Sequence, residues 1–73
     1  MAKSRTLEEK LMGAAVVKTT FRLRGDLNSP MFNSLYPGLL EDLGLQDEQV
    51  DAFIEQHRED VDFKARSALK LTQ

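Results

Sequence analysis

The chain has 73 residues, no cysteine and a formal net charge of −2. This length restricts it to one small domain with a net stability of only a few kcal/mol, and the lack of cysteine excludes disulfides and thiolate metal sites. No apolar run is long enough for a membrane-spanning helix, and residues 1–10 lack the apolar region of a signal peptide. We therefore expect a protein of the cytoplasm.

Charge is unevenly distributed along the chain. Residues 1–26 carry a net charge of +3, residues 27–63 carry −8 and residues 64–73 carry +3. An asymmetry of this kind can steer association with charged partners. The alternative interpretation is that the charges pair with one another on the folded surface.

The first expected helix begins after Thr6. Thr-Leu-Glu-Glu matches a capping box, in which the side chains of Thr6 and Glu9 each accept a hydrogen bond from the other's backbone N–H. This pattern predicts a helix from Leu7 to about Val16. We expect one domain between two short tails, with boundaries at 1–5, 6–70 and 71–73.

Residues 17–24 alternate apolar or β-branched side chains with polar ones. A period of two with β-branched enrichment predicts a short strand. Its candidate partner is the segment 61–65, which also alternates. Either these two segments pair, or residues 17–24 are irregular or helical.

A second start signal lies at Ser29, which can cap a helix whose first turn accommodates Pro30. We expect one or two helical turns over residues 31–35, followed by a break at Tyr36-Pro37-Gly38. The segment around this break is rich in apolar residues, most of which should be core. One or two of them left exposed would form an anchor patch for a partner. The candidates are Met31, Phe32, Leu35, Tyr36 and Pro37.

Residues 39–58 have the apolar spacing of a helix, a glycine turn and a second helix that begins at residue 46 or 47. Gly44 is expected to end the first helix in a left-handed conformation, and Val50 and Phe53 supply the core contacts of the second. The pattern resembles a helix-turn-helix. Leu40 departs from it, because the motif usually has a small residue at that position, where the helices touch.

The start of the second helix in this motif is acidic. In a DNA-binding protein this surface would face phosphates, which its carboxylates would repel. Two interpretations remain open: the acids stabilise the positive end of the helix dipole, or they form a docking face for a basic or polar protein surface. The residues concerned are Asp47, Glu48, Asp51 and Glu55.

The clearest helical period follows, with His57 and the apolar residues at 50, 53, 54, 61, 65 and 68 on one face. The helix either runs unbroken to Leu69 or breaks near residues 58–60. Residues 61–71 are alternatively a strand, but their helix propensity favours a helix. We therefore predict a mainly α single small domain of three to four short helices with a helix-turn-helix-like hairpin. A two-stranded pairing of residues 17–24 with 61–65 would make the fold α+β instead.

Basic residues flank an aromatic ring in the segment that contains Lys18, Phe21, Arg22 and Arg24. Interleaved basic and aromatic side chains are typical of single-strand nucleic-acid binding. The segment is a candidate second contact, either to nucleic acid or to an acidic protein surface. The alternative is a half-buried strand with solvated charges.

The sequence predicts no catalytic site, no cofactor and no metal site. It has one histidine, no cysteine and no glycine-rich phosphate loop. His57 falls on the apolar side of its helix, where a packing role is expected. Glu55, Glu59 and Asp62 are the candidate carboxylate ligands, but helical carboxylates mostly face solvent.

Over its whole length the sequence resembles the small transcription regulators with which lytic Xanthomonas phages capture host RNA polymerase. The resemblance lies in the 73-residue length, the opening MAKSRTLEEKLMGAAVVKTTFRLRGDL, the lack of catalytic residues and the acidic helical centre. It implies a protein that binds bacterial RNA polymerase, inhibits initiation by weakening sigma-factor engagement, and promotes antitermination.

Together these features predict a monomeric, non-enzymatic transcription regulator that binds protein, with no membrane contact and no direct binding to duplex DNA. Asp47, Glu48, Asp51 and Glu55 would form the partner-binding face, and Lys18, Arg22 and Arg24 the second, basic contact. The alternatives are a helix-turn-helix DNA-binding protein and an antitoxin-like module that binds one protein.

Overall fold

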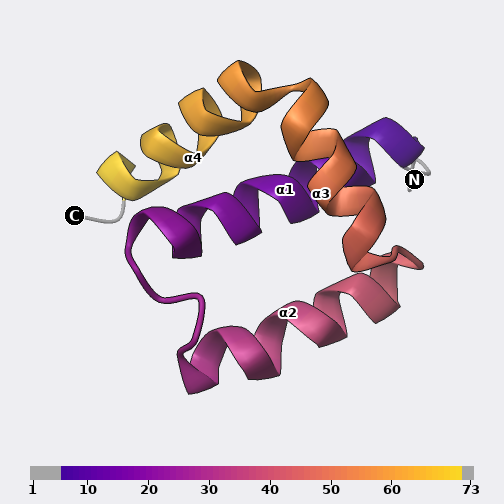
Figure 1. The fold of residues 1–73 in the computed structure, drawn as a ribbon, viewed down its shortest axis with the longest axis horizontal. Helices are drawn as coiled ribbons and strands as arrows, with labels where there is room; N and C mark the ends of the chain where they lie inside the picture. The colour runs from indigo at the N-terminus through magenta and orange to yellow at the C-terminus, as the bar shows by residue number, and fades with distance from the viewer. Residues whose placement is uncertain (1–5, 72–73) are drawn as a thin grey trace, which may run out of the picture.

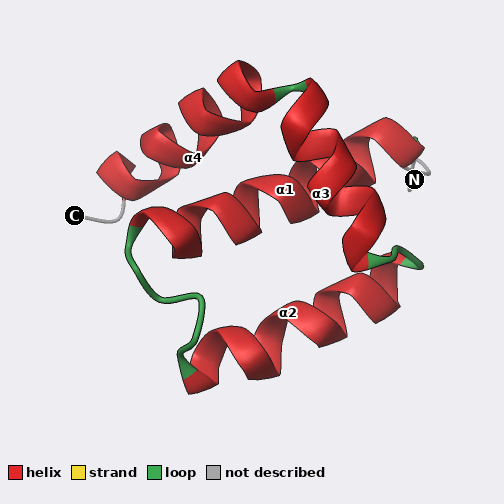
Figure 2. Ribbon diagram, in the orientation of Figure 1, coloured by secondary structure: helices red, strands yellow, loops and turns green. Residues whose placement is uncertain are grey.

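The computed structural model describes residues 6–71, nearly all of them helical (Figures 1 and 2). The helices are α1, Leu7–Leu23; α2, Pro30–Leu43; α3, Asp47–Gln56; and α4, Arg58–Leu71. No strand occurs in residues 6–71. The mainly α prediction is confirmed. Of the alternatives left open for residues 17–24, the pairing with 61–65 does not occur and the helical one holds for residues 17–23. The predicted tail 1–5 and residues 72–73 of the predicted tail 71–73 lie outside the described residues, whereas residue 71 is the last residue of α4.

Helix α1 is the central element. It contacts each of the other three helices, and α3 also contacts α4. In Figure 1, α1 runs through the middle of the molecule between α2 and α4, and α3 crosses it toward its N-terminal end. None of the helices in the described part of the chain is both long and apolar enough to cross a membrane.

The residues predicted as a strand form the second half of α1. The capping box that starts this helix is confirmed: the Thr6 N–H donates to Glu9 Oε1 at 2.9 Å, and the Glu9 N–H donates to Thr6 Oγ1 at 3.1 Å. The helix then continues past Val16 to Leu23. Because three helices pack around α1, its inward-facing residues point in several directions, and the short alternation in residues 17–24 was a misleading guide to local structure.

Helix α2 does not break at Tyr36-Pro37-Gly38, contrary to the prediction. Ser29 caps it as expected, with its Oγ accepting from the Phe32 N–H at 3.2 Å. A proline inside a helix costs about 3 kcal/mol, partly through the lost hydrogen bond to the residue four positions earlier. That residue, Asn33, and Pro37 are both exposed, so water can bind the unpaired carbonyl, while Phe32 and Tyr36 on a neighbouring face of the helix pack inward.

The turn between α2 and α3 has the predicted form. Gly44 adopts a left-handed conformation with φ 70° and ψ 34°, and the Leu45 N–H donates to the Leu40 carbonyl at 2.9 Å. This closes α2 and directs the buried Leu45 into the core. Val50 and Phe53 of α3 are buried as predicted.

Two glycines allow a direct test of this turn. Gly13 lies inside α1 with open space where a Cβ would be, so Gly13→Ala should stabilise the protein by about 0.5–1 kcal/mol. Gly44→Ala also meets open space, but its positive φ should make the substitution destabilising by about 1–2 kcal/mol. Urea denaturation of both variants measures the difference, and equal effects of the same sign would contradict it.

His57 separates α3 from α4. It leaves helical geometry, with φ −125° and ψ 38°, and its ring packs 4.4 Å from the ring of Phe53. The expected packing role of His57 is consistent with this contact. The helix therefore breaks one residue before the 58–60 segment, and residues 61–71 are helical, as the propensity argument predicted. Val61 and Ala65 of α4 complete the core with no exposed surface.

Candidate partner-binding surfaces

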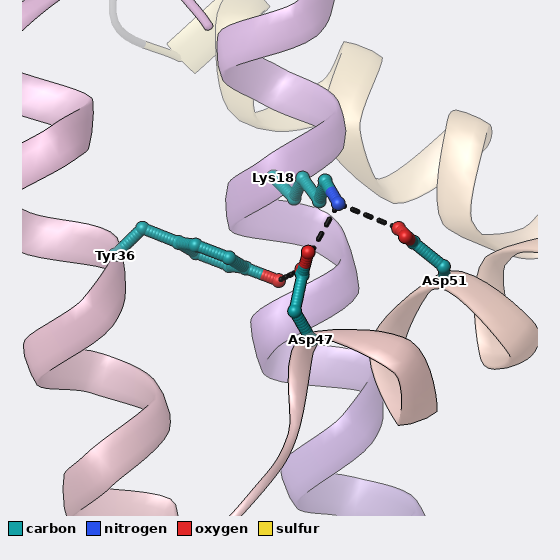
Figure 3. A network of polar contacts seen from close by, with 4 residues as sticks. All are labelled: Lys18, Tyr36, Asp47 and Asp51. Atoms are coloured by element: carbon teal, nitrogen blue, oxygen red, sulfur yellow. Dashed lines mark hydrogen bonds and ion pairs between the residues drawn. The ribbon is translucent and has the colours of Figure 1, made fainter.

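Lys18 connects the two surfaces that the sequence predicted as separate (Figure 3). Its Nζ lies 3.0 Å from Asp47 Oδ1 and 2.6 Å from Asp51 Oδ1. The Tyr36 hydroxyl donates to the same Asp47 oxygen at 2.8 Å. This Lys18 network, made of Lys18, Tyr36, Asp47 and Asp51, links α1, α2 and α3.

Helical geometry explains how the network assembles. Asp47 is the first residue of α3 and Asp51 follows about one turn later, so both carboxylates lie on the same side of the helix. Tyr36 is fixed by stacking on Phe32, with ring centroids 4.8 Å apart and planes 14° apart. The ammonium of Lys18 lies 5.7 Å from the centre of the Tyr36 ring, within range of a cation–π attraction.

The network shifts the pKa values of three of its members. Burial lowers the pKa of Lys18, but hydrogen bonds to Asp51 and Asp47 and their charges outweigh it, and the net pKa is raised. Burial raises the pKa of Asp47, but hydrogen bonds from Lys18 and Tyr36 bring the net value below normal. Burial, with the hydrogen bond to Asp47 and the nearby carboxylate charges, strongly raises the pKa of the Tyr36 phenol. Each shift favours the protonation state that holds the network together at neutral pH.

The four acids of the predicted docking face differ in their surroundings. Asp47 and Asp51 are held by Lys18 but keep 53% and 57% of their side-chain surface exposed. Glu55 Oε2 lies 3.3 Å from Arg58 Nη2. Glu48 is exposed and makes no ion pair within residues 6–71. The face is therefore still accessible, but part of its charge is compensated internally.

The predicted basic contact is also paired. Besides Lys18, Arg22 Nη2 lies 3.6 Å from Asp62 Oδ1 on α4, and Arg24 Nε lies 3.6 Å from Asp26 Oδ2. These contacts correspond to the folded-back charge pairing considered from the sequence. The alternation that suggested a basic strand belongs to a helix, so Lys18, Arg22 and Arg24 do not form the face of a strand.

The apolar segment around Pro37 divides between core and surface. Phe32 and Tyr36 are buried, whereas Met31 and Leu35 are 67% and 53% exposed. Pro30, Met31, Ser34 and Leu35 line an open hollow on the outer side of α2. We call Met31 and Leu35 the α2 anchor pair. One or two exposed residues were expected here from the sequence, but which ones they are depends on α2 being continuous.

A further exposed surface lies on α4 and was not anticipated. Phe63 is 73% exposed, more than the other large hydrophobic side chains exposed in the described residues. With Arg66, Ser67, Leu69 and Lys70 it lines a second open hollow. The sequence did contain a clue to this surface. Phe63 does not belong to the helical face formed by residues 50, 53, 54, 57, 61, 65 and 68, so in a helix its ring must point away from the core.

Within residues 6–71, no three histidine, aspartate or glutamate side chains are grouped so that they could hold a metal ion. Comparisons with protein-family models, with curated proteins and with solved structures find no match to this chain.

Proposed function

We propose that this protein is a non-enzymatic transcription regulator that binds bacterial RNA polymerase in the host cytoplasm. It would inhibit host initiation by weakening sigma-factor engagement, and it would promote antitermination. The sequence resemblance suggests the polymerase as partner. The support from the fold concerns the chemical class of that partner, which is protein and not duplex DNA.

The observation that carries the proposal is the α2 anchor pair. Met31 and Leu35 are four residues apart, so they lie on one side of the helix, and together they expose most of two large apolar side chains. Burying such side chains in a partner's pocket is favourable by about 1.5–3 kcal/mol each. Polypeptide surfaces supply pockets of this kind, whereas the phosphate-lined exterior of a duplex does not.

The electrostatics of α3 support the same conclusion. If α2 and α3 acted as a helix-turn-helix, α3 would enter the DNA groove, yet α3 contains no lysine or arginine. Its start is also tied back to α1 through the Lys18 network. Non-specific DNA binding gains most of its affinity from lysine and arginine contacts to phosphates, which release counterions. α3 could make no such contacts.

In this proposal the acids of α3 guide the encounter, while the α2 anchor pair provides the affinity. Glu48 and Glu55 are exposed, and Asp47 and Asp51 each keep an accessible side. Charges at the rim of an interface act mainly on the association rate and on its salt dependence. A basic region of the polymerase is therefore the expected docking partner.

Replacing both anchor residues should abolish most of the binding. We expect the double substitution Met31→Asp and Leu35→Asp to weaken binding to purified Xanthomonas RNA polymerase by at least about tenfold, because two apolar contacts become charged. The same variant should lose its inhibition of sigma-dependent run-off transcription. Leu7→Asp is the matched control, because Leu7 is also more than half exposed and lies on α1.

A salt titration with random duplex DNA provides the opposing test. If the wild-type protein fails to bind polymerase at micromolar concentration but binds DNA with an affinity that falls steeply with salt, the proposal is wrong and a DNA-binding function replaces it. Equal losses for the anchor double variant and Leu7→Asp would also contradict the assignment of the anchor pair.

A further inference from the structure

The C-terminal half of α4 combines an exposed aromatic ring with positive charge. Phe63, Arg66, Ser67 and Lys70 are spaced three, four and seven residues apart from the first, which places them on one side of the helix. They line a shared open hollow with Leu69. The core contacts of α4 lie elsewhere, through the fully buried Val61 and Ala65.

The basic residues in this half of α4 differ from most other basic residues in the described part of the chain, because they make no ion pair within the protein. No ion pair within residues 6–71 involves Arg66 or Lys70. The same is true of Lys64, which lies on another side of the helix. By contrast, a carboxylate oxygen lies within 3.6 Å of each of the bases Lys18, Arg22, Arg24 and Arg58. The positive charge beside Phe63 is thus available to an external group.

We propose that Phe63, Arg66 and Lys70 form a docking surface for an acidic amphipathic segment of a partner protein. Apolar side chains of that segment would cover the ring of Phe63, and its carboxylates would pair with Arg66 and Lys70. Arginine binds carboxylates through two parallel hydrogen bonds, which adds directional specificity to the charge attraction. Aromatic and arginine side chains are also those that dominate binding energy at protein interfaces.

The dimensions of the surface distinguish this partner from a nucleic acid. From Phe63 to Lys70 the helix rises about 10 Å. One turn before Phe63, on the same side, lies Glu59, which with Asp60 makes the first turn of α4 acidic. A phosphate backbone following this face would meet negative charge at once, whereas a short acidic segment can end before reaching it.

This surface is independent of the α2 anchor pair and of the proposed polymerase partner. It lies on α4, whereas the anchor pair lies on α2, and each of these helices contacts α1. A failure of the anchor variants to affect polymerase binding would therefore not bear on the α4 surface, and its own test uses a defined peptide.

The test is fluorescence anisotropy of the full-length protein with a labelled peptide of about fifteen residues, a length near the minimum for an isolated helix. The peptide contains only leucine and glutamate at helical spacing, and its companion carries glutamine in place of glutamate. We expect Arg66→Glu and Lys70→Glu each to weaken peptide binding at least about fivefold, and Phe63→Ala about threefold. Lys64→Glu is the matched control and should change it less than about twofold.

The surface assignment is overturned if Lys64→Glu weakens binding as much as Arg66→Glu, because the attraction would then be a non-specific effect of net charge. It is also overturned if the wild-type protein does not bind the acidic peptide saturably, or binds the glutamine peptide equally well. Tighter binding of oligo-dT or of phosphatidylserine vesicles than of the peptide would assign the surface to a nucleic acid or to a membrane instead.

Discussion

Replacement of Phe53 by alanine is expected to remove nearly all of the protein's stability, so that a large fraction of it is unfolded at room temperature. Phe53 is 5% exposed and belongs to the core formed by α1, α3 and α4. Removing a buried phenylalanine side chain costs about 3–5 kcal/mol, through lost apolar burial and the cavity left behind. A domain of this size has a total stability of about that amount, so this one substitution should remove nearly all of it.

The chain supplies a matched control for this prediction. Phe63, on the adjacent helix, is 73% exposed, and Phe63→Ala should change the free energy of unfolding by less than about 0.5 kcal/mol. Circular dichroism during urea denaturation measures both variants. If the two substitutions had similar effects, the packing of α3 against α1 would have to differ from the one described.

The second large effect is a loss of stability at alkaline pH. Because the pKa of Tyr36 is raised in the folded protein, its phenol loses a proton more readily in the unfolded chain, whose tyrosine pKa is near 10. The stabilisation is therefore complete below pH 10 and declines above it, by up to about 1.4 kcal/mol per pH unit. Lys18 acts in the same direction, because its pKa is also raised.

The substitution Tyr36→Phe separates the contributions of Tyr36 and Lys18 to the loss of stability at alkaline pH. It removes the hydroxyl that donates to Asp47, and so should cost about 1 kcal/mol at pH 7. Above pH 10 the variant should lose stability more slowly than the wild type, and what remains should come mainly from Lys18. Urea denaturation from pH 7 to pH 11 measures both profiles. Parallel declines in the two proteins would show that Tyr36 does not ionise in the way its surroundings require.

Three of the helix ends, the starts of α1 and α2 and the end of α2 at Gly44, were predictable from the sequence because their chemistry is local. The capping box at Thr6, the cap at Ser29 and the left-handed Gly44 each involve residues within a few positions of one another. The two errors arose where distant contacts decide the local structure. Residues 17–23 are helical because three helices surround α1, and α2 passes through Pro37 because Phe32 and Tyr36 pack inward while Pro37 is exposed.

The candidate surfaces were harder to predict for the same reason. The sequence identified Lys18, Asp47 and Asp51 as charged surface residues, but Lys18 is 29 and 33 residues from its two partners. No spacing rule relates positions so far apart, so their mutual pairing required the packing of α3 on α1. The α4 surface was missed because it consists of the α4 residues that do not pack into the core, and the packing of the helices decides which residues these are.

The central position of α1 has a consequence for the order in which the chain acquires its structure. α1 is synthesised before the other three helices, yet its contacts with α4 are the most extensive between any two helices of the described residues. The core cluster that contains its buried Ala14 and Ala15 also includes Val61 of α4, so this cluster is incomplete until Val61 has left the ribosome. Folding of this core during translation must therefore wait for α4, and until then the nascent chain exposes apolar surface on which other chains or chaperones can act.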